Sequence, residues 1–538
     1  MNPNIRKLTV LLLSAALLGA CGDDDHSEEW DNSLRVGQPL RANGDLLFVN
    51  ENLQQVVRLQ PKRSGEEIDL EIDRASTGAD PGARALSADE SQLFVVNEEL
   101  DEQGASLSVY DLSGESLSAQ TVGLDSAYDR LSVDPEGEFL LLSFTGGGGN
   151  FVARNLNELG IVDLRDGIAD DEEASFQTLS NRPRDIIFAP KFTLDGSEQR
   201  LAASLAESEV TIIDLLAEDE ANRLREVPLT ISQADQVRTP TQAIFDVTPE
   251  ESMPNTVSLY LLTDTGQDIT HVAIQPSIRQ DANRKFDISV NQLAAGNNPA
   301  RMKLLELDEQ GSRIIAIDQN RPEFTMIDVQ SGESSTFDLP MTAPAEDLLV
   351  YQTSVDGEPE TRVLAWSSRS PLVSVIRPES IAISDDTPTL GRSVEAIRLK
   401  AAPSRVQLDE ETNGERAIVH HAGLGAGFTV LNLRTNRAVP IQGASLGDIY
   451  FGQVYAYGVF RGEPYFGLFD LETGHPTAFE LPKEGERIYL DGEDELLVVQ
   501  HADRTGSFTL LNATNPIPEN AKVFNDIFLE NLFGQELP

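Results

Sequence analysis

The chain has 538 residues, of which 89 are Asp or Glu and 41 are Lys or Arg, so its formal net charge is −48. Nucleic-acid binding depends on Lys and Arg side chains that neutralise phosphates, so this charge argues against a nucleic-acid partner. The hydrophobic fraction of 40% is sufficient for a folded core, and the single cysteine, Cys21, excludes stabilisation by a disulfide within the chain.

The first 20 residues have the pattern of a leader. Arg6 and Lys7 precede an apolar run over residues 8–18, and small residues follow it. The run is too short for a membrane-spanning helix, so it predicts a secretory signal peptide. The stretch Leu18-Gly19-Ala20-Cys21 resembles the bacterial lipobox. That resemblance implies cleavage before Cys21 and lipid attachment to it; the alternative is an ordinary signal peptide with a chance cysteine.

The segment after the leader, residues 21–33, includes GDDDHSEEWD and has few apolar residues. Such a composition predicts an extended, solvated tether. Together with the lipidated cysteine, it predicts a protein anchored in the bacterial cell envelope. Gly22 is not the aspartate that the lipobox resemblance associates with retention in the inner membrane, so the outer membrane is favoured. Whether the body faces the periplasm or the cell surface stays open.

Residues 34–520 contain ten similar stretches, each with short runs of β-branched and aromatic residues separated by turns rich in Asp, Asn and Gly. They cover 42–61, 85–114, 131–167 (with an insertion), 192–215, 257–276, 304–333, 362–379, 406–436, 454–474 and 486–516. This pattern predicts strands in meanders. Near-continuous apolar runs such as IIAID predict strands covered on both faces. We therefore expect an all-β fold, a β-propeller, with a β-solenoid or a pair of sandwiches as the alternative.

The stretches ADESQLFVVNE (88–98) and DPEGEFLLLSF (134–144) resemble the YVTN-type, WD40-like propeller repeat. The resemblance implies a propeller, and this repeat occurs in surface-layer-like proteins and in lactonase-like enzymes. Because some stretches can be insertions within longer blades, we expect one ring of seven to ten four-stranded blades. Closure would require a strand near residues 35–40 to pair with the last blade. The apolar face of VFNDIFLENLF (523–533) predicts a short C-terminal helix in a helical tail, 521–538.

Candidate chemistry is sparse. The chain has no HExxH, GxSxG or cysteine nucleophile. His420 and His501 lie at the ends of matching strands, which makes them weak candidates for a metal or acid–base site in the channel; structural histidines are the alternative. The loops 409–415 and 490–495 have enough carboxylates for Ca²⁺ or another divalent cation, although solvated turns are the simpler interpretation.

These observations favour a binding or scaffolding module for a protein, a glycan or a small ligand. The alternative is an enzyme, similar to lactonase-like or other hydrolytic or redox propellers, with a site in the central channel. A structural envelope protein is the third interpretation. The acidic surface itself is interpreted first as adaptation to a salty habitat and second as a binding face.

Overall fold

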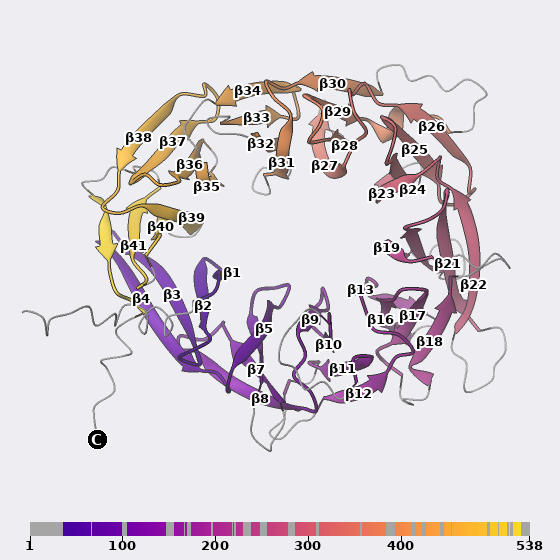
Figure 1. Ribbon diagram of the computed structural model, residues 1–538, viewed down its shortest axis with the longest axis horizontal. Coiled ribbons are helices and arrows are strands. Elements are labelled where there is room, and N and C mark those ends of the chain that lie inside the picture. Colours follow the sequence, from indigo (N-terminus) through magenta and orange to yellow (C-terminus); the bar gives the residue numbers. More distant parts are fainter. Residues whose placement is uncertain are drawn as a thin grey trace, which may run out of the picture.

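The structure is a computed structural model. It describes residues 36–528 apart from 66, 99–104, 147–154, 166, 169–173, 195–196, 218, 220–221, 230–237, 248–255, 278–285, 308–310, 356–357, 384–392, 410–414, 422–426, 442–445, 453, 492–494, 504, 514–515 and 517–519. The signal peptide, Cys21 and most of the tether therefore lie outside the described residues. The described chain forms ten four-stranded antiparallel sheets arranged as one ring around a central opening (Figure 1).

In the first five blades the strands follow one another from the channel outwards. They are β1 (Leu40–Ala42), β2 (Asp45–Asn50), β3 (Gln55–Ser64) and β4 (Glu67–Ser76); β5 (Pro81–Leu86), β6 (Gln92–Asn97), β7 (Ala105–Asp111) and β8 (Ser118–Leu124); β9 (Arg130–Val133), β10 (Phe139–Ser143), β11 (Glu158–Asp163) and β12 (Ser175–Thr178); β13 (Asp185–Phe188), β16 (Leu201–Leu205), β17 (Glu209–Asp214) and β18 (Leu224–Pro228); β19 (Pro240–Val247), β20 (Val257–Thr263), β21 (Asp268–Pro276) and β22 (Phe286–Ala294). A two-stranded ribbon, β14 (Phe192–Leu194) and β15 (Ser197–Gln199), is inserted in the fourth blade.

The last five blades repeat the same order. They are β23 (Pro299–Leu307), β24 (Gly311–Asp318), β25 (Glu323–Asp328) and β26 (Ser334–Asp338); β27 (Asp347–Val355), β28 (Glu358–Trp366), β29 (Leu372–Ile376) and β30 (Val394–Arg398); β31 (Pro403–Leu408), β32 (Arg416–His421), β33 (Phe428–Asn432) and β34 (Arg437–Ile441); β35 (Leu446–Phe451), β36 (Tyr455–Phe460), β37 (Tyr465–Asp470) and β38 (Pro476–Glu480); β39 (Gly485–Asp491), β40 (Leu496–His501), β41 (Phe508–Asn512) and β42 (Lys522–Phe524). A 3₁₀ turn, η2 (Pro378–Ser380), follows β29.

Each of the ten repeated stretches in the sequence contributes to one blade, so the expected range of seven to ten blades is confirmed at its upper end. The second strands are the most apolar. Every described residue of β20 and β10 is buried, because both faces of these strands pack against neighbouring blades. The outermost strand β4 instead begins with a strict alternation of exposed and buried residues. The hydrophobic core is consequently a series of layers between blades.

The expected C-terminal helix is wrong for the residues that the structure describes. Lys522–Phe524 forms β42, which pairs with β41 and completes the last blade. Ile527 and Phe528 are buried against the first and last blades, so the apolar residues of this segment do dock on the body, but from an extended chain and a turn. Residues 529–538 lie outside the described part of the chain.

The expected mode of ring closure is also wrong. β1 pairs with β2 of its own blade, and the N-terminal segment adds only an isolated bridge between Val36 and Asn50. The first and last blades are therefore built from opposite ends of the chain, and they share no strand among the residues that the structure describes. Side chains close the ring: Phe48 packs edge-to-face on Phe508 and Phe528, with ring centroids 5.8 and 5.1 Å apart.

Polar contacts reinforce this closing seam. The Arg74 Nη2 donates to the Ile527 carbonyl oxygen at 3.0 Å, and the Lys522 Nζ lies 2.9 Å from an Asp69 carboxylate oxygen. On the channel side, the Arg41 Nη2 donates to the Leu490 carbonyl oxygen at 2.8 Å. If both chain ends had contributed strands to one blade, backbone hydrogen bonds within that sheet would close the ring. In this structure the seam depends instead on apolar burial and a few side-chain hydrogen bonds.

Two buried arginines and one half-buried arginine connect consecutive blades. Arg313, Arg362 and Arg416 lie on the second strands of three successive blades, and each donates to a backbone carbonyl of the following blade. The accepting oxygens belong to Ile381, Leu433 and Gly452, at 2.9, 3.2 and 3.1 Å. Hydrogen bonds of a charged donor are stronger than neutral ones, so these arginines hold the blades in register around the ring.

Candidate functional site

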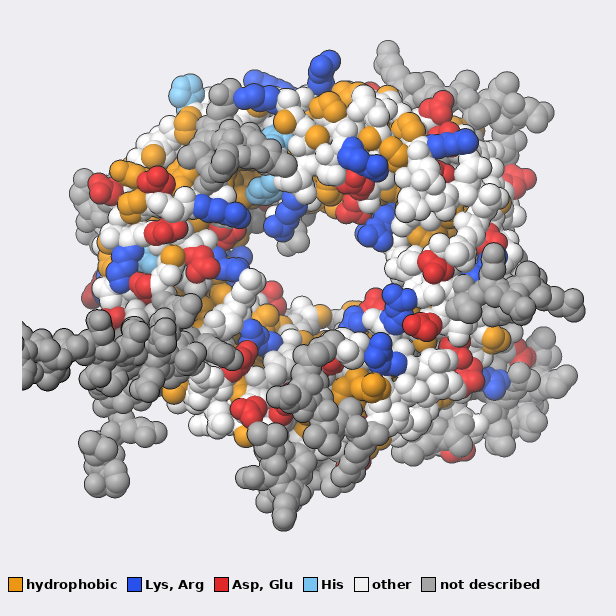
Figure 2. Space-filling view, viewed as in Figure 1, with side chains coloured by type: hydrophobic (Ala, Val, Ile, Leu, Met, Phe, Trp, Pro, Cys, Tyr) orange, Lys and Arg blue, Asp and Glu red, His pale blue; other side chains and the backbone are white. Residues whose placement is uncertain are grey.

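The innermost strands line the central opening, and Lys and Arg side chains gather around its edge (Figure 2). The charge balance of these strands differs from that of the chain. Their basic residues are Arg41, Arg84, Arg130, Arg301, Lys303, Arg405 and Arg487, and their acidic residues are Asp185, Asp246, Glu306, Asp347, Asp448, Glu486 and Asp491. Acids outnumber bases by more than two to one in the whole sequence, but the described inner strands are balanced.

A recurring backbone irregularity positions four of these arginines. The pairing register of the innermost strand shifts between Pro81 and Arg84, and the shift recurs immediately before Arg301, Arg405 and Arg487. A β-bulge at this point bends the strand and re-aims the side chain that follows it. The sequence carries a signal for this arrangement, Pro or Gly shortly before Arg, which sequence reasoning missed.

Of the 26 arginines among the described residues, ten form an ion pair with a carboxylate: Arg58, Arg130, Arg165, Arg200, Arg238, Arg321, Arg362, Arg369, Arg377 and Arg416. Arg130 pairs with Asp185 at the channel, and Arg238 lies 2.9 Å from Asp268. Arg301 and Arg405 are exposed on innermost strands and take part in none of the ion pairs found among the described residues.

A cleft of about 480 Å³ opens between the ninth and tenth blades at the same mouth of the channel. Arg461 and Arg487 line it together with Asp448, Glu484 and Glu486. Two of the acids already accept hydrogen bonds from backbone amides. Asp448 Oδ2 accepts from the Ile488 N–H at 3.2 Å, and Glu484 Oε1 accepts from the Gly462 N–H at 2.6 Å. The two arginines have no carboxylate partner in the described structure.

We refer to Arg301, Arg405, Arg461 and Arg487 as the mouth arginines. Three lie at the start of an innermost strand, and Arg461 follows the second strand β36, so all four belong to the end of the channel where innermost strands begin. Gly485 allows the ninth and tenth blades to approach each other here, because a Cβ on it would lie 2.7 Å from the Val459 Cγ1. The mouth therefore combines a rigid backbone with guanidinium groups available to a ligand.

His501 lies behind the wall of this cleft and is fully buried. Its Nδ1 is 3.2 Å from the Glu484 carbonyl oxygen and its Nε2 is 2.7 Å from the Thr509 Oγ1. His421 makes the same pair of contacts in the eighth blade, to Ala402 and Thr429. Burial lowers the pKa of His501, which favours the neutral ring. His501 thus matches His421 in position, and its contacts fix the backbone beside the cleft.

His420, the other sequence candidate, is half-buried and stands opposite Arg405 in the pairing of β31 with β32. Burial lowers the pKa of His420, and the nearby Arg405 lowers it further, while Asp448 of the next blade acts in the opposite direction. The structure therefore places His420 beside the mouth arginines and His501 behind them. The two histidines belong to blades separated by the ninth blade.

Within the described ranges, no three His, Cys, Asp or Glu side chains come together in a group that could hold a metal ion. Most of the two acidic loops suggested for Ca²⁺, residues 410–414 and 492–494, lies outside those ranges, so that expectation stays a prediction. Among the residues that were placed, no helix is long and apolar enough to cross a membrane.

No protein-family model and no curated protein matches the sequence. Solved structures align with the chain at low similarity. Dihydro-heme d1 dehydrogenase NirN has a TM-score of 0.36 and 11% identity over 91% of this chain and 76% of its own. Apo AztD from Citrobacter koseri has a TM-score of 0.31 and 10% identity over 68% of this chain and 87% of its own. At such values the similarity says nothing about ligand or activity.

Proposed function

We propose that this protein is a binding module of the bacterial cell envelope that holds an anionic ligand against the mouth arginines. The observation that carries the proposal is that four arginines gather at one end of the channel and take part in none of the ion pairs found among the described residues, in a chain with more than twice as many acids as bases. Guanidinium groups match carboxylate and phosphate geometry, and each charge-assisted hydrogen bond contributes about 1.5–3 kcal/mol. Placing them at the mouth of a rigid channel favours an anion there.

The overall charge limits the size of the ligand. A long polyanion would be repelled by a protein with a net charge of −48. A small anion, or a single acidic group within a glycan or a protein, would meet the mouth arginines without facing the whole acidic surface. Glu484 and Glu486 at the cleft would accept hydrogen bonds from hydroxyl groups of such a ligand.

Calorimetric titration of residues 22–538 with a galacturonate trisaccharide and with inorganic phosphate tests the proposal. We expect saturable binding that weakens as NaCl rises from 20 to 200 mM, because salt screens these contacts. Arg405→Gln combined with Arg487→Gln should lower the affinity at least tenfold. Arg434→Gln is the matched control, since Arg434 is exposed in a turn of the outer part of the eighth blade. Equal losses in both variants would contradict the proposal.

A second candidate is a hydrolytic enzyme similar to lactonase-like propellers. The observation in its favour is His420, which stands opposite Arg405 in the sheet and whose pKa is lowered by burial, which favours the neutral ring. A neutral imidazole at a channel mouth can accept a proton from water, and an arginine can stabilise a developing oxyanion. Turnover of a lactone and ester panel that disappears in His420→Gln would support this candidate, and turnover unaffected by the substitution would exclude it.

The place of action is part of the proposal. The lipobox-like stretch at residues 18–21 supports anchoring through a lipid on Cys21, with the outer membrane favoured. Two or more acyl chains give stable membrane attachment, whereas one does not. Mass spectrometry of the protein extracted from membranes should find an acylated N-terminal Cys21. Cys21→Ser should move the protein to the soluble fraction, and an unchanged membrane fraction would contradict lipid anchoring.

A further inference from the structure

The chain enters the ring at the same end of the channel as the mouth arginines. Val36 forms an isolated bridge with Asn50, the last residue of β2, and the Gly37 N–H donates to the Val49 carbonyl oxygen at 3.4 Å. The Arg84 guanidinium group packs so closely on Gly37 that a Cβ there would collide with it. The chain then continues directly into the innermost strand β1. Because the innermost strands begin at the mouth, the segment that precedes Val36 joins the ring there.

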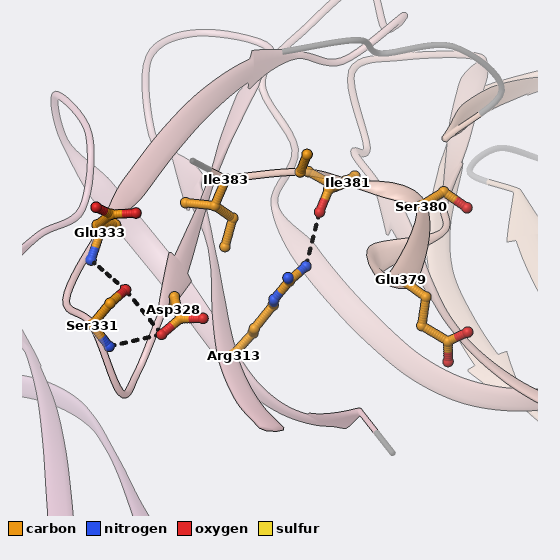
Figure 3. Close-up of a pocket in the computed structure, with 9 residues that line it drawn as sticks. Arg313, Asp328, Ser331, Glu333, Glu379, Ser380, Ile381 and Ile383 are labelled. Atoms are coloured by element: carbon orange, nitrogen blue, oxygen red, sulfur yellow. Dashed lines mark hydrogen bonds between the residues drawn. The ribbon is translucent and has the colours of Figure 1, made fainter. Parts of the chain in front are cut away.

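The mouth differs from a second cavity, of about 430 Å³, which lies between the sixth and seventh blades. The one arginine among the described residues that line this cavity is Arg313, which is more than nine-tenths buried. Its Nη1 donates to the carbonyl oxygens of Pro378 and Ile381, at 3.2 and 2.9 Å (Figure 3). Of the four mouth arginines, by contrast, three are exposed and one is half-buried. An acidic partner can therefore reach guanidinium groups at the mouth but not in this cavity.

The tether that precedes Val36 is the complement of the mouth in charge. Residues 21–33 contain no Lys or Arg and six carboxylates, which belong to Asp23, Asp24, Asp25, Glu28, Glu29 and Asp31. Trp30 lies between the last two of these acids. An indole ring is the best aromatic partner for a guanidinium group, and carboxylates form charge-assisted hydrogen bonds with it. The composition of the tether therefore suits a cluster of arginines.

The tether is also long enough to reach the nearest mouth arginines. An extended chain spans at most about 3.3–3.6 Å per residue, so Asp31 can lie up to about 17 Å from Val36 and Asp23 up to about 45 Å. Arg487 belongs to the tenth blade, which adjoins the first, and Arg461 follows β36 of the ninth blade. Packed sheets lie about 10 Å apart, so both arginines are within reach of the tether.

We propose that the tether, residues 21–33, occupies Arg461 and Arg487 when no ligand is bound, and that an anionic ligand must displace it. This inference rests on the function proposed for the mouth. Because the tether and the mouth belong to one chain and the connection is short, the effective concentration of the tether is on the order of millimolar. Weak contacts between carboxylates and guanidinium groups therefore suffice. Two of the three cleft acids accept hydrogen bonds from backbone amides, so Glu486 is the main acid that opposes the contact.

The fluorescence of Trp30 tests the contact without any ligand. The chain has two tryptophans, so Trp366→Phe in residues 22–538 leaves Trp30 as the only reporter. At 20 mM NaCl we expect Trp30 to be protected from quenching by acrylamide. Raising NaCl to 500 mM should increase the quenching constant at least threefold, because salt screens the contact. Replacing all six tether carboxylates by their amides should have the same effect at 20 mM NaCl.

Substitutions at the mouth test the other side of the contact. Arg461→Gln combined with Arg487→Gln should raise the quenching of Trp30 at least threefold at 20 mM NaCl. Arg434→Gln, in the outer part of the eighth blade, is the matched control and should leave Trp30 protected. In calorimetric titration, the protein with the amide tether should bind phosphate and the galacturonate trisaccharide at least fivefold more tightly than the protein with the acidic tether.

The proposal is overturned if Trp30 is quenched equally with and without the two mouth substitutions, or if the amide tether leaves the affinity for a bound anion unchanged. It is also overturned if Trp30 is freely quenched while the same arginines are needed for binding to phosphatidylglycerol vesicles or for dimerisation, because the mouth would then belong to a membrane or to a second copy of the chain. If neither anion binds and Trp30 is protected by the mouth arginines, the function proposed for the mouth is wrong, whereas the contact with the tether is supported.

Discussion

The seam between the first and last blades depends on Phe528, and its removal should open the ring at that point. Phe528 packs against Phe48 of the first blade and Phe508 of the last, with ring centroids 5.1 and 6.2 Å apart. It is 5% exposed, and its N–H donates to the Thr505 carbonyl oxygen at 3.0 Å. Phe528→Ala removes the ring but keeps this backbone hydrogen bond. A buried Phe replaced by Ala costs about 3–5 kcal/mol.

Phe528→Ala differs from other truncations in the core in which strands it should destabilise. The other nine seams are crossed by the continuous chain, whereas the described residues hold this seam through side-chain packing, side-chain hydrogen bonds and an ion pair. We therefore expect Phe528→Ala to increase amide hydrogen exchange in β2, β3, β40 and β41. Amide exchange measures the free energy of local opening in each region of a protein separately. Protection in the sixth and seventh blades should be unchanged.

Phe466→Ala is the matched control. Phe466 is fully buried between the ninth and tenth blades and stacks on Phe479, with ring centroids 5.0 Å apart. It should cost a similar free energy, but exchange should increase in β36 and β37 and not in β2. If Phe528→Ala destabilises the protein by less than 1 kcal/mol, or if both variants expose β2 equally, the account of ring closure is wrong.

Four further outcomes are expected from denaturant and pH titrations. Arg362→Met leaves the half-buried Glu360 with only the longer contact to Arg377, at 3.9 Å, and should cost about 3 kcal/mol. The double variant with Glu360→Leu should recover most of this loss, and equal stabilities of the single and double variants would exclude the explanation. Burial raises the pKa of Asp134 from 3.8 to about 6, so its contribution to stability is present below pH 3.8 and is lost as pH rises to 6. Asp134→Asn should remove that slope, by at most about 3 kcal/mol between pH 4 and 6, and an unchanged slope would refute the assignment. Burial lowers the pKa of His501, so the native protein should lose stability as pH falls below about 6.5, and His501→Gln should lose less. Gly485→Ala places a Cβ 2.7 Å from Val459 and should cost about 1–3 kcal/mol, measured as a shift of the denaturation midpoint.

The sequence predicted correctly those features that depend on residues close together in the chain. Runs such as LFVVN and IIAID are apolar on both faces, and the structure buries them between blades as β6 and β24. The ten repeated stretches correspond to ten blades because each stretch includes one such second strand. The C-terminal segment was misassigned because its helical periodicity competed with an unpaired edge on β41, which Lys522–Phe524 covers.

The candidate site was only partly predictable. His420 and His501 were selected from matching strand ends, but adjacent histidines alternate faces, so the equivalent of His501 is His421. The mouth arginines are spread over nearly 200 residues of sequence and become neighbours of one channel only when the ring forms.

The sequence by itself determined an all-β protein of repeated four-stranded units, because strand periodicity, turn residues and burial on both faces are properties of short segments. Only the tertiary structure decided how many units form the ring, how its ends meet and which charges remain without partners. These features depend on contacts between blades that are distant in sequence, and pairing of a charge is decided by geometry rather than by composition.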